Sequence, residues 1–164
     1  MNDQVEDEVD FPRELIEETE GPPAEEVYKS LYKQVMEMTV AEKIKLALTG
    51  NREARNLLLK DVNKVVLTSV VNSPKITDDE IIKICQSRTV SEEVLKMIAA
   101  RREMLKKYPV KLGLATNPKT PVPLAVRLLN SVSEMDLRNI AKSKNVSSVV
   151  SRVARKILGE RGKL

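Results

Sequence analysis

A chain of 164 residues can form one domain with a sizeable core, and with one Phe, three Tyr and no Trp that core must be aliphatic. The absence of histidine and the presence of a single cysteine nearly exclude zinc sites, Ser-His or Cys-His nucleophiles and an internal disulfide. The net charge of +4 is the sum of two unlike parts, because residues 1–26 carry −10 and residues 27–164 carry +14.

Residues 1–26 form an acidic segment with little apolar content. Eleven acidic residues and one basic residue lie here, with Gly21-Pro22-Pro23 near the end and one apolar group, Phe11, Leu15 and Ile16. This composition cannot bury enough surface to offset the entropy of ordering, so we expect a mostly disordered tail. The simpler interpretation is a solvating tail with a short helical turn. In the alternative, the tail folds back onto the basic body or competes with an anionic partner for it.

After Pro23 the sequence pattern is helical almost to the end of the chain. Apolar spacing predicts a helix over residues 24–38, and Thr39-Val40-Ala41-Glu42 has the spacing of a capping box for a second helix. Gly50-Asn51 should end that second helix, and the side chain of Asn51 can cap the next one.

A further helix is expected to start at Asp61 and to run through Val65–Val71. This segment is rich in β-branched residues and on propensity alone would favour a strand. Its place within a repeated helical pattern decides for a helix.

Two six-residue segments, Asn72–Thr77 and Thr116–Pro121, are near copies 44 residues apart. The proline in each lacks an N–H and biases the residue before it away from helical angles, so each copy should end the preceding helix. A new helix should then begin. Thr77-Asp78-Asp79-Glu80 has capping-box spacing, and Thr120-Pro121 fits an N-cap followed by proline at the first helical position.

Further internal similarity links Thr89-Val90-Ser91-Glu92 with Ser131-Val132-Ser133-Glu134, at an offset of 42 residues, and with the segment at Thr39, at an offset of 50. These offsets fit a two-helix unit with variable loops, in the range of HEAT and armadillo repeats. The last predicted helix, from Val146 to Leu158, is amphipathic and should end at Gly159. We therefore predict an all-α fold, a short right-handed α-α superhelix.

The Asn-Pro-Lys-Thr-Pro turn at 117–121, followed by an aliphatic helix, resembles the leucine-rich-repeat-variant and HEAT-like class of bacterial helical solenoids. Two runs, Leu48-Thr49-Gly50-Asn51-Arg52-Glu53-Ala54-Arg55 and Lys142-Ser143-Lys144-Asn145-Val146, are similar to those of small uncharacterised bacterial proteins of the kind seen in deltaproteobacteria. The resemblance extends from about Thr39 onward and implies the solenoid fold, with no activity attached. Pro109 departs from a regular repeat and leaves the number of units open.

The densest basic group in the chain is the best candidate for a partner-binding site. It comprises Arg101, Arg102, Lys106, Lys107 and Lys111, which Lys60 and Lys64 are expected to join from the equivalent place one unit earlier. On a helix, Arg102 and Lys106 share a face and could meet a phosphate or a carboxylate cluster. The simpler interpretation is that all of these are solvated side chains on a positive protein.

Other candidates have structural explanations. Arg152, Arg155, Lys156, Arg161 and Lys163 form a second positive region, where cations also favour a helix C-terminus. Cys85, in an aliphatic helix, reads as a small buried thiol. The acidic residues Asp78, Asp79, Glu80, Glu92 and Glu93 suit helix starts better than a metal site. Tyr28 and Tyr32 lie four residues apart on an apolar stripe, so packing explains them more simply than base stacking.

Three classes of function follow. The leading hypothesis is a non-catalytic adaptor or scaffold over residues 27–164, whose basic surface binds an acidic peptide or protein partner. The alternative is binding of nucleic acid through its phosphate backbone, against which stand the acidic tail and the absence of Trp. An enzyme is disfavoured, because the chain has no histidine, no nucleophile motif and no paired carboxylates outside capping positions.

The remaining expectations concern ligands and location. We expect no metal and no cofactor. The chain has no apolar run of about 20 residues and its acidic N-terminus lacks the features of a signal peptide, so we expect no membrane insertion and a cytoplasmic protein. The oligomeric state is left open.

Overall fold

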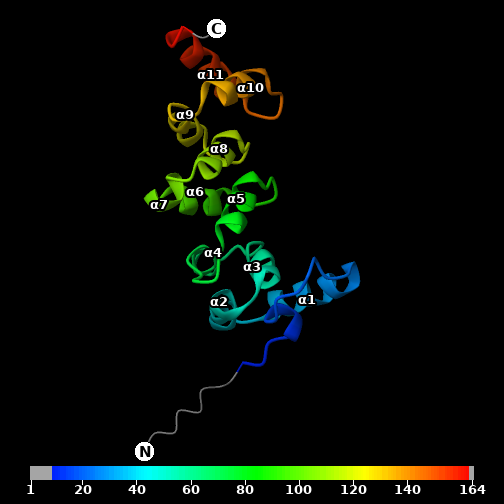
Figure 1. The fold of residues 1–164 in the computed structure, drawn as a ribbon. Coiled ribbons are helices and arrows are strands. Elements are labelled where there is room, and N and C mark those ends of the chain that lie inside the picture. Colours follow the sequence, from blue (N-terminus) through cyan, green and yellow to red (C-terminus); the bar gives the residue numbers. More distant parts are fainter. Residues whose placement is uncertain (1–8, 163–164) are drawn as a thin grey trace, which may run out of the picture. The chain divides into compact units, whose positions relative to one another are not determined.

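The computed structural model describes residues 9–162, and within them the fold is all-α, with eleven α-helices and no strand (Figure 1). The chain divides into two compact units between Ile76 and Thr77. The first unit holds η1 (Arg13–Leu15), α1 (Glu25–Glu37), α2 (Val40–Thr49), α3 (Arg52–Leu58) and α4 (Lys64–Val71). The second holds α5 (Asp78–Gln86), α6 (Glu92–Ala99), α7 (Arg102–Leu105), α8 (Tyr108–Thr116), α9 (Val122–Leu129), α10 (Glu134–Lys142) and α11 (Ser148–Glu160).

The helix starts of the first unit follow local capping chemistry. Thr39 accepts a hydrogen bond from the backbone N–H of Glu42, whose carboxylate accepts one from the N–H of Thr39, so the predicted capping box is confirmed. Asn51 caps α3 as predicted, through the backbone N–H of Ala54. The β-branched run does form a helix, α4.

The predicted helix start at Asp61 is wrong. The N-cap of α4 is Asn63, whose side chain accepts from the backbone N–H of Val65 at 2.9 Å. Asp61 lies in the preceding loop, where one carboxylate oxygen accepts from the backbone N–H of Asn63 at 2.8 Å. The other accepts from Lys43 Nζ at 2.7 Å, and both side chains of this ion pair are at most 11% exposed. Asp61 therefore anchors the loop to α2.

Part of the acidic N-terminal segment packs against the first unit. Leu15 is fully buried, and its carbonyl accepts a hydrogen bond from the backbone N–H of Asn51 at 2.8 Å. The side-chain amide of Asn51 donates to the carbonyls of Glu14, at 2.8 Å, and Glu17, at 2.6 Å. Asn51 is itself 2% exposed, so one buried side chain both caps α3 and holds the turn around Leu15.

Four loops share one side-chain hydrogen bond, and two of them are the near copies seen in the sequence. They are 73–77, 87–91, 117–121 and 143–147. In each, the side-chain oxygen of the first residue, Ser or Asn, accepts a hydrogen bond from the backbone N–H of the third, at 2.9 to 3.4 Å. The fourth residue is buried in two of the loops and half-buried in the other two, and the fifth is the N-cap of the next helix. The similarity of the two near copies therefore reflects a shared turn.

The prediction that Thr120 caps the next helix is wrong. Thr120 is the fourth residue of its loop, where the equivalent residues are Ile76, Val90 and Val146, and it is 4% exposed. The N-cap of α9 is Pro121, which has no side chain able to cap. The hydroxyl of Thr120 finds no hydrogen-bond partner in the described part of the chain. A hydroxyl thus stands where the other loops place an aliphatic side chain.

We expect Thr120→Val to stabilise the protein by about 1 kcal/mol, because it removes a buried hydroxyl that makes no hydrogen bond and keeps the β-branched shape. The measurement is urea unfolding followed by circular dichroism. The matched control is Val90→Thr, the reverse change at the equivalent position, which should lower the free energy of unfolding by about 1 to 2 kcal/mol. A loss of stability in Thr120→Val would show that the hydroxyl has a partner.

The last helix differs from its prediction at both ends, because α11 begins at Ser148, with Ser147 as its N-cap, and Val146 lies in the loop before it. Its apolar face is buried as expected, through Val150, Ala154, Ile157 and Leu158. Gly159 lies within α11, so the prediction that it ends the helix is wrong. Gly162 follows the C-cap residue Arg161 and has a φ of 66°, the left-handed conformation that glycine adopts at helix ends.

Candidate functional site

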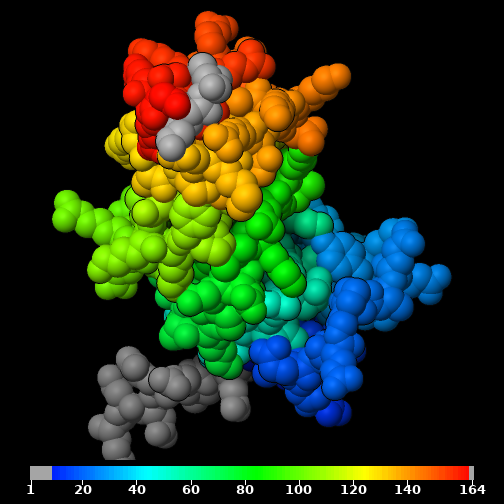
Figure 2. All heavy atoms as spheres, turned by 45° about the horizontal axis from the view of Figure 1, so that its top comes forward, coloured from blue at the N-terminus to red at the C-terminus, as the bar shows by residue number. Residues whose placement is uncertain are grey.

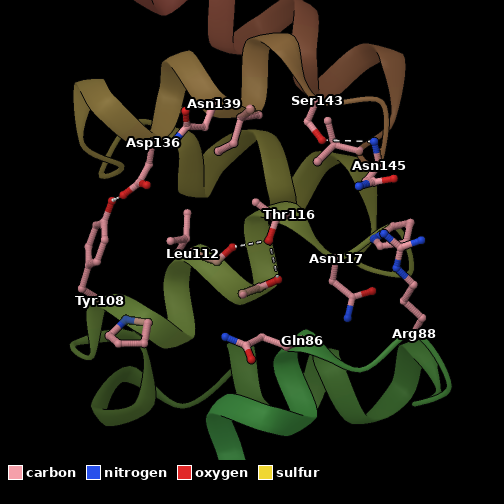
Figure 3. Close-up of a pocket in the computed structure, with 15 residues that line it drawn as sticks. Gln86, Arg88, Tyr108, Leu112, Thr116, Asn117, Asp136, Asn139, Ser143 and Asn145 are labelled. Atoms are coloured by element: carbon pink, nitrogen blue, oxygen red, sulfur yellow. Dashed lines mark hydrogen bonds between the residues drawn. The ribbon is translucent and has the colours of Figure 1, made fainter.

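A groove of about 500 Å³ crosses one face of the second unit and is the candidate functional site (Figure 3). It lies over α8 and α10, and the C-terminal end of α5 and the loop after α10 complete it. Its apolar lining is Pro109, Leu112, Gly113, Pro118, Ile140 and Val146. Its polar lining is Gln86, Arg88, Tyr108, Thr116, Asn117, Asp136, Asn139, Ser143 and Asn145.

Close packing of two helices fixes the floor of the groove. A side chain at Gly113 would put its Cβ 3.0 Å from the Cβ of Cys85, so glycine lets α8 lie directly on α5. Asn117, at the end of α8, then donates from its side-chain amide to the carbonyls of Cys85, at 2.7 Å, and Ser87, at 2.8 Å. Asn117 is 6% exposed and its role in the groove is structural.

One end of the groove is closed by a side-chain bridge between α8 and α10. The hydroxyl of Tyr108 donates to the carboxylate of Asp136 and accepts from the backbone N–H of Ser133, as Figure 3 shows in part. Asp136 also accepts from the hydroxyl of Ser133 at 2.9 Å, within the first turn of α10. The negative charge of Asp136 is therefore already engaged inside the protein.

Four other polar side chains of the groove make no hydrogen bond within residues 9–162. Gln86, Asn139 and Asn145 are exposed, and their side-chain amides make no hydrogen bond with residues 9–162. Arg88 is also exposed, and within the same residues its guanidinium has no hydrogen bond or ion pair. Figure 3 shows Arg88 and Asn145 at the end of the groove away from Tyr108. These four side chains can contact a ligand without breaking internal bonds.

The predicted basic group lies around α7, outside the groove lining. The segment around α7 projects from the surface of the second unit in the space-filling view (Figure 2). Arg102 begins this helix, and Lys106, its C-cap residue, donates its backbone N–H to the Arg102 carbonyl, so the two lie one turn apart. Both are exposed.

The other three members of this group are paired or partly buried. Lys107 forms an ion pair with Asp78 at the start of α5. Arg101 is half-buried at the N-cap of α7, and Lys111 is half-buried on α8. Only Arg102 and Lys106 of the five are fully exposed.

Lys60 and Lys64 belong to the first unit, and Lys60 is already engaged there. The ammonium group of Lys60 lies 4.7 Å from the ring centre of Tyr28 and 5.5 Å from that of Tyr32, and it donates to the Tyr28 hydroxyl. This contact ties the loop before α4 to α1. Lys64 is the first residue of α4 and is exposed.

Two arginines of the second positive region have structural roles. Arg155 donates twice to the carbonyl of Ala141 at the end of α10, at 2.9 and 3.1 Å. Arg161 donates to the carbonyls of Asn130 and Val132 in the loop after α9. Arg152 and Lys156 are exposed, and Lys163 lies outside the described residues.

The thiol and several of the carboxylates that the sequence offers are buried or paired. Burial raises the pKa of the Cys85 thiol to about 12, which keeps the thiol protonated. Thr77 and Glu80 form the predicted capping box, and Glu92 and Glu93 pair with Lys96. Within residues 9–162, no three His, Cys, Asp or Glu side chains lie close enough together to hold a metal ion.

No protein-family model, curated protein or solved structure matches the chain. None of the helices in the described part is both long enough and apolar enough to cross a membrane.

Proposed function

We propose that the protein is a non-catalytic interaction module, built as a short HEAT-like superhelix, whose second unit binds an acidic segment of a partner protein. The shared turns support the architecture, because they place successive helices by the same local geometry. Close packing of α8 on α5 through Gly113 supports it as well.

The charge of the second unit is the observation that carries the proposal. From residue 77 to the end the sequence has eighteen basic and nine acidic residues, a net charge of +9, whereas residues 1–76 carry −5. Arg102 and Lys106 are exposed cations on a projecting segment, and no contact in the described residues holds them. A partner of negative charge is favoured at such a surface both in encounter rate and in specificity.

The test is recovery of partners from an extract of the source cells by the tagged full chain. Arg102→Ser combined with Lys106→Ser should lower the recovery of a bound protein about fivefold, because two exposed ion pairs are lost. Arg101 and Lys107 are left unchanged, because Arg101 is half-buried and Lys107 is paired with Asp78. The matched control is Lys33→Ser combined with Lys45→Ser, which removes the same charge from exposed helix positions of the first unit.

Nuclease treatment separates the two classes of partner. If the recovered protein survives nuclease and is reduced only by the double variant at α7, the proposal holds. If the recovered material is nucleic acid, or proteins that disappear with nuclease, the protein is a nucleic-acid-binding solenoid instead and its affinity should fall steeply with salt.

A further inference from the structure

We propose that the groove over α8 and α10 is a peptide-binding site, which takes an extended acidic segment of the partner. In this site Arg88 contacts a carboxylate, and the side-chain amides of Gln86, Asn139 and Asn145 contact the peptide main chain. The inference rests on the proposed function and gives it a second site, separate from the exposed cations at α7.

The amide side chains indicate a ligand with free backbone groups. A side-chain amide carries both N–H donors and a carbonyl acceptor, so it can pair with the C=O or the N–H of a peptide. The three amides come from the end of α5, the middle of α10 and the loop after α10, and all three line the groove. An extended peptide offers unpaired N–H and C=O groups along its edges, whereas a helix has already used most of its own.

The floor of the groove suits the alternating side chains of an extended segment. In such a segment successive side chains point to opposite sides, so every second one can face the protein. The half-buried side chains of Leu112 and Val146 provide apolar surface for those side chains, and Gly113 adds no side chain to fill the space. The remaining side chains of the peptide would point to solvent, where acidic residues are well tolerated.

The charges in the groove favour an acidic peptide. Asp136 is bonded to Tyr108 and Ser133 at the closed end, and Arg88, at the far end, is not bonded within residues 9–162. The guanidinium N–H groups of Arg88 can therefore donate two parallel hydrogen bonds to one carboxylate, the arrangement that arginine favours.

The test is selection of a displayed library of random twelve-residue peptides on the immobilised full chain. Acidic peptides should be enriched, and a selected peptide labelled with fluorescein should bind in an anisotropy titration. Arg88→Ala should weaken its binding about tenfold, the usual loss for one charge-assisted contact. Asn139→Ala should weaken it about fivefold, by loss of main-chain hydrogen bonds. The matched control, Arg152→Ala, removes an exposed arginine of the same unit outside the groove and should change affinity less than twofold.

A second form of the same peptide tests whether the protein contacts the main chain of the peptide. Methylation of alternate backbone nitrogens keeps every side chain and removes main-chain donors, so it should abolish binding if the amides contact the main chain. Enrichment of no peptide, or peptides that bind the Arg88 and Asn139 variants with unchanged affinity, would overturn the groove as the site. If these peptides keep their affinity for the Arg88 and Asn139 variants but no longer bind the Arg102→Ser, Lys106→Ser double variant, they bind at α7. The proposed function would then hold without the groove.

Discussion

Asn51→Ala should lower the free energy of unfolding by about 3 kcal/mol and release the turn around Leu15. The substitution removes the cap of α3, worth about 1 kcal/mol, and two hydrogen bonds to the carbonyls of Glu14 and Glu17, worth about 1 kcal/mol each. Since Asn51 is almost fully buried, alanine also leaves a space that water does not readily fill. Urea unfolding followed by circular dichroism measures the total loss.

The matched control for this prediction is Asn63→Ala, which removes an N-cap of the same type from α4; within residues 9–162 the Asn63 side chain makes only this hydrogen bond. It should cost about 1 kcal/mol. Hydrogen exchange separates the two roles of Asn51, because the amides of Ile16 and Glu17, bonded to the Arg13 carbonyl, should exchange faster only in Asn51→Ala. Equal losses of stability in the two variants, with unchanged exchange at these amides, would show that Asn51 acts only as a cap.

Asp61→Asn should lower the free energy of unfolding by about 3 kcal/mol at neutral pH, because it leaves the nearly buried ammonium group of Lys43 without its counter-charge. The asparagine can still accept from the backbone N–H of Asn63, so the loop keeps its turn. The matched control, Glu37→Gln, removes an exposed carboxylate of the same unit and should change stability by less than about 0.5 kcal/mol.

The effect of Asp61 on stability should depend on pH in a defined direction. Burial acts to raise the pKa of this carboxyl, but the hydrogen bonds from Lys43 and from the backbone N–H of Asn63 outweigh it and hold the pKa below the usual 3.8. A lowered pKa in the folded state stabilises the protein above the unfolded-state value, and this stabilisation is lost as pH falls through the folded-state value. The difference between wild type and Asp61→Asn should therefore be constant near neutral pH and shrink below 3.8. A difference that is unchanged at acid pH would contradict the ion pair.

Features of the fold that depend on neighbouring residues could be predicted from the sequence. The capping boxes at Thr39 and Thr77 need only a hydroxyl and a glutamate three residues later, and both form. Val65–Val71 becomes a helix against its propensity, because four of its residues are buried in the first unit. The periodic pattern was a better guide there than β-propensity.

Features that depend on distant residues or on loop register could not be predicted. Thr120-Pro121 has a plausible local capping pattern, but the turn that starts at Asn117 puts Thr120 inside and Pro121 at the cap. Asp61 does not cap α4, because its carboxylate pairs with Lys43, eighteen residues away. Leu15 was recognised as part of the only apolar group in the acidic segment, and its burial depends on Asn51. Sequence spacing carries no information on such contacts.

The candidate groove was missed for a related reason. A search for dense charge selects the five basic residues from Arg101 to Lys111, none of which lines the groove. Arg88 stands alone between Ser87 and Thr89, and the amides come from three separate segments. The one available signal was the similarity of the loops at 87–91 and 143–147, because both contribute to the groove. An alignment of the loops on each other would have placed Arg88 beside Lys144.

The turn that recurs four times also determines how such a protein can change in size. Each copy is five residues long, is held by a bond between its own first and third residues, and ends at the cap of the next helix. This bond lies within the loop in every copy. A duplicated loop would carry its own bond and its own helix cap with it. Insertion or deletion of one loop together with the helix that it caps therefore leaves the bond and the cap of every other copy in place.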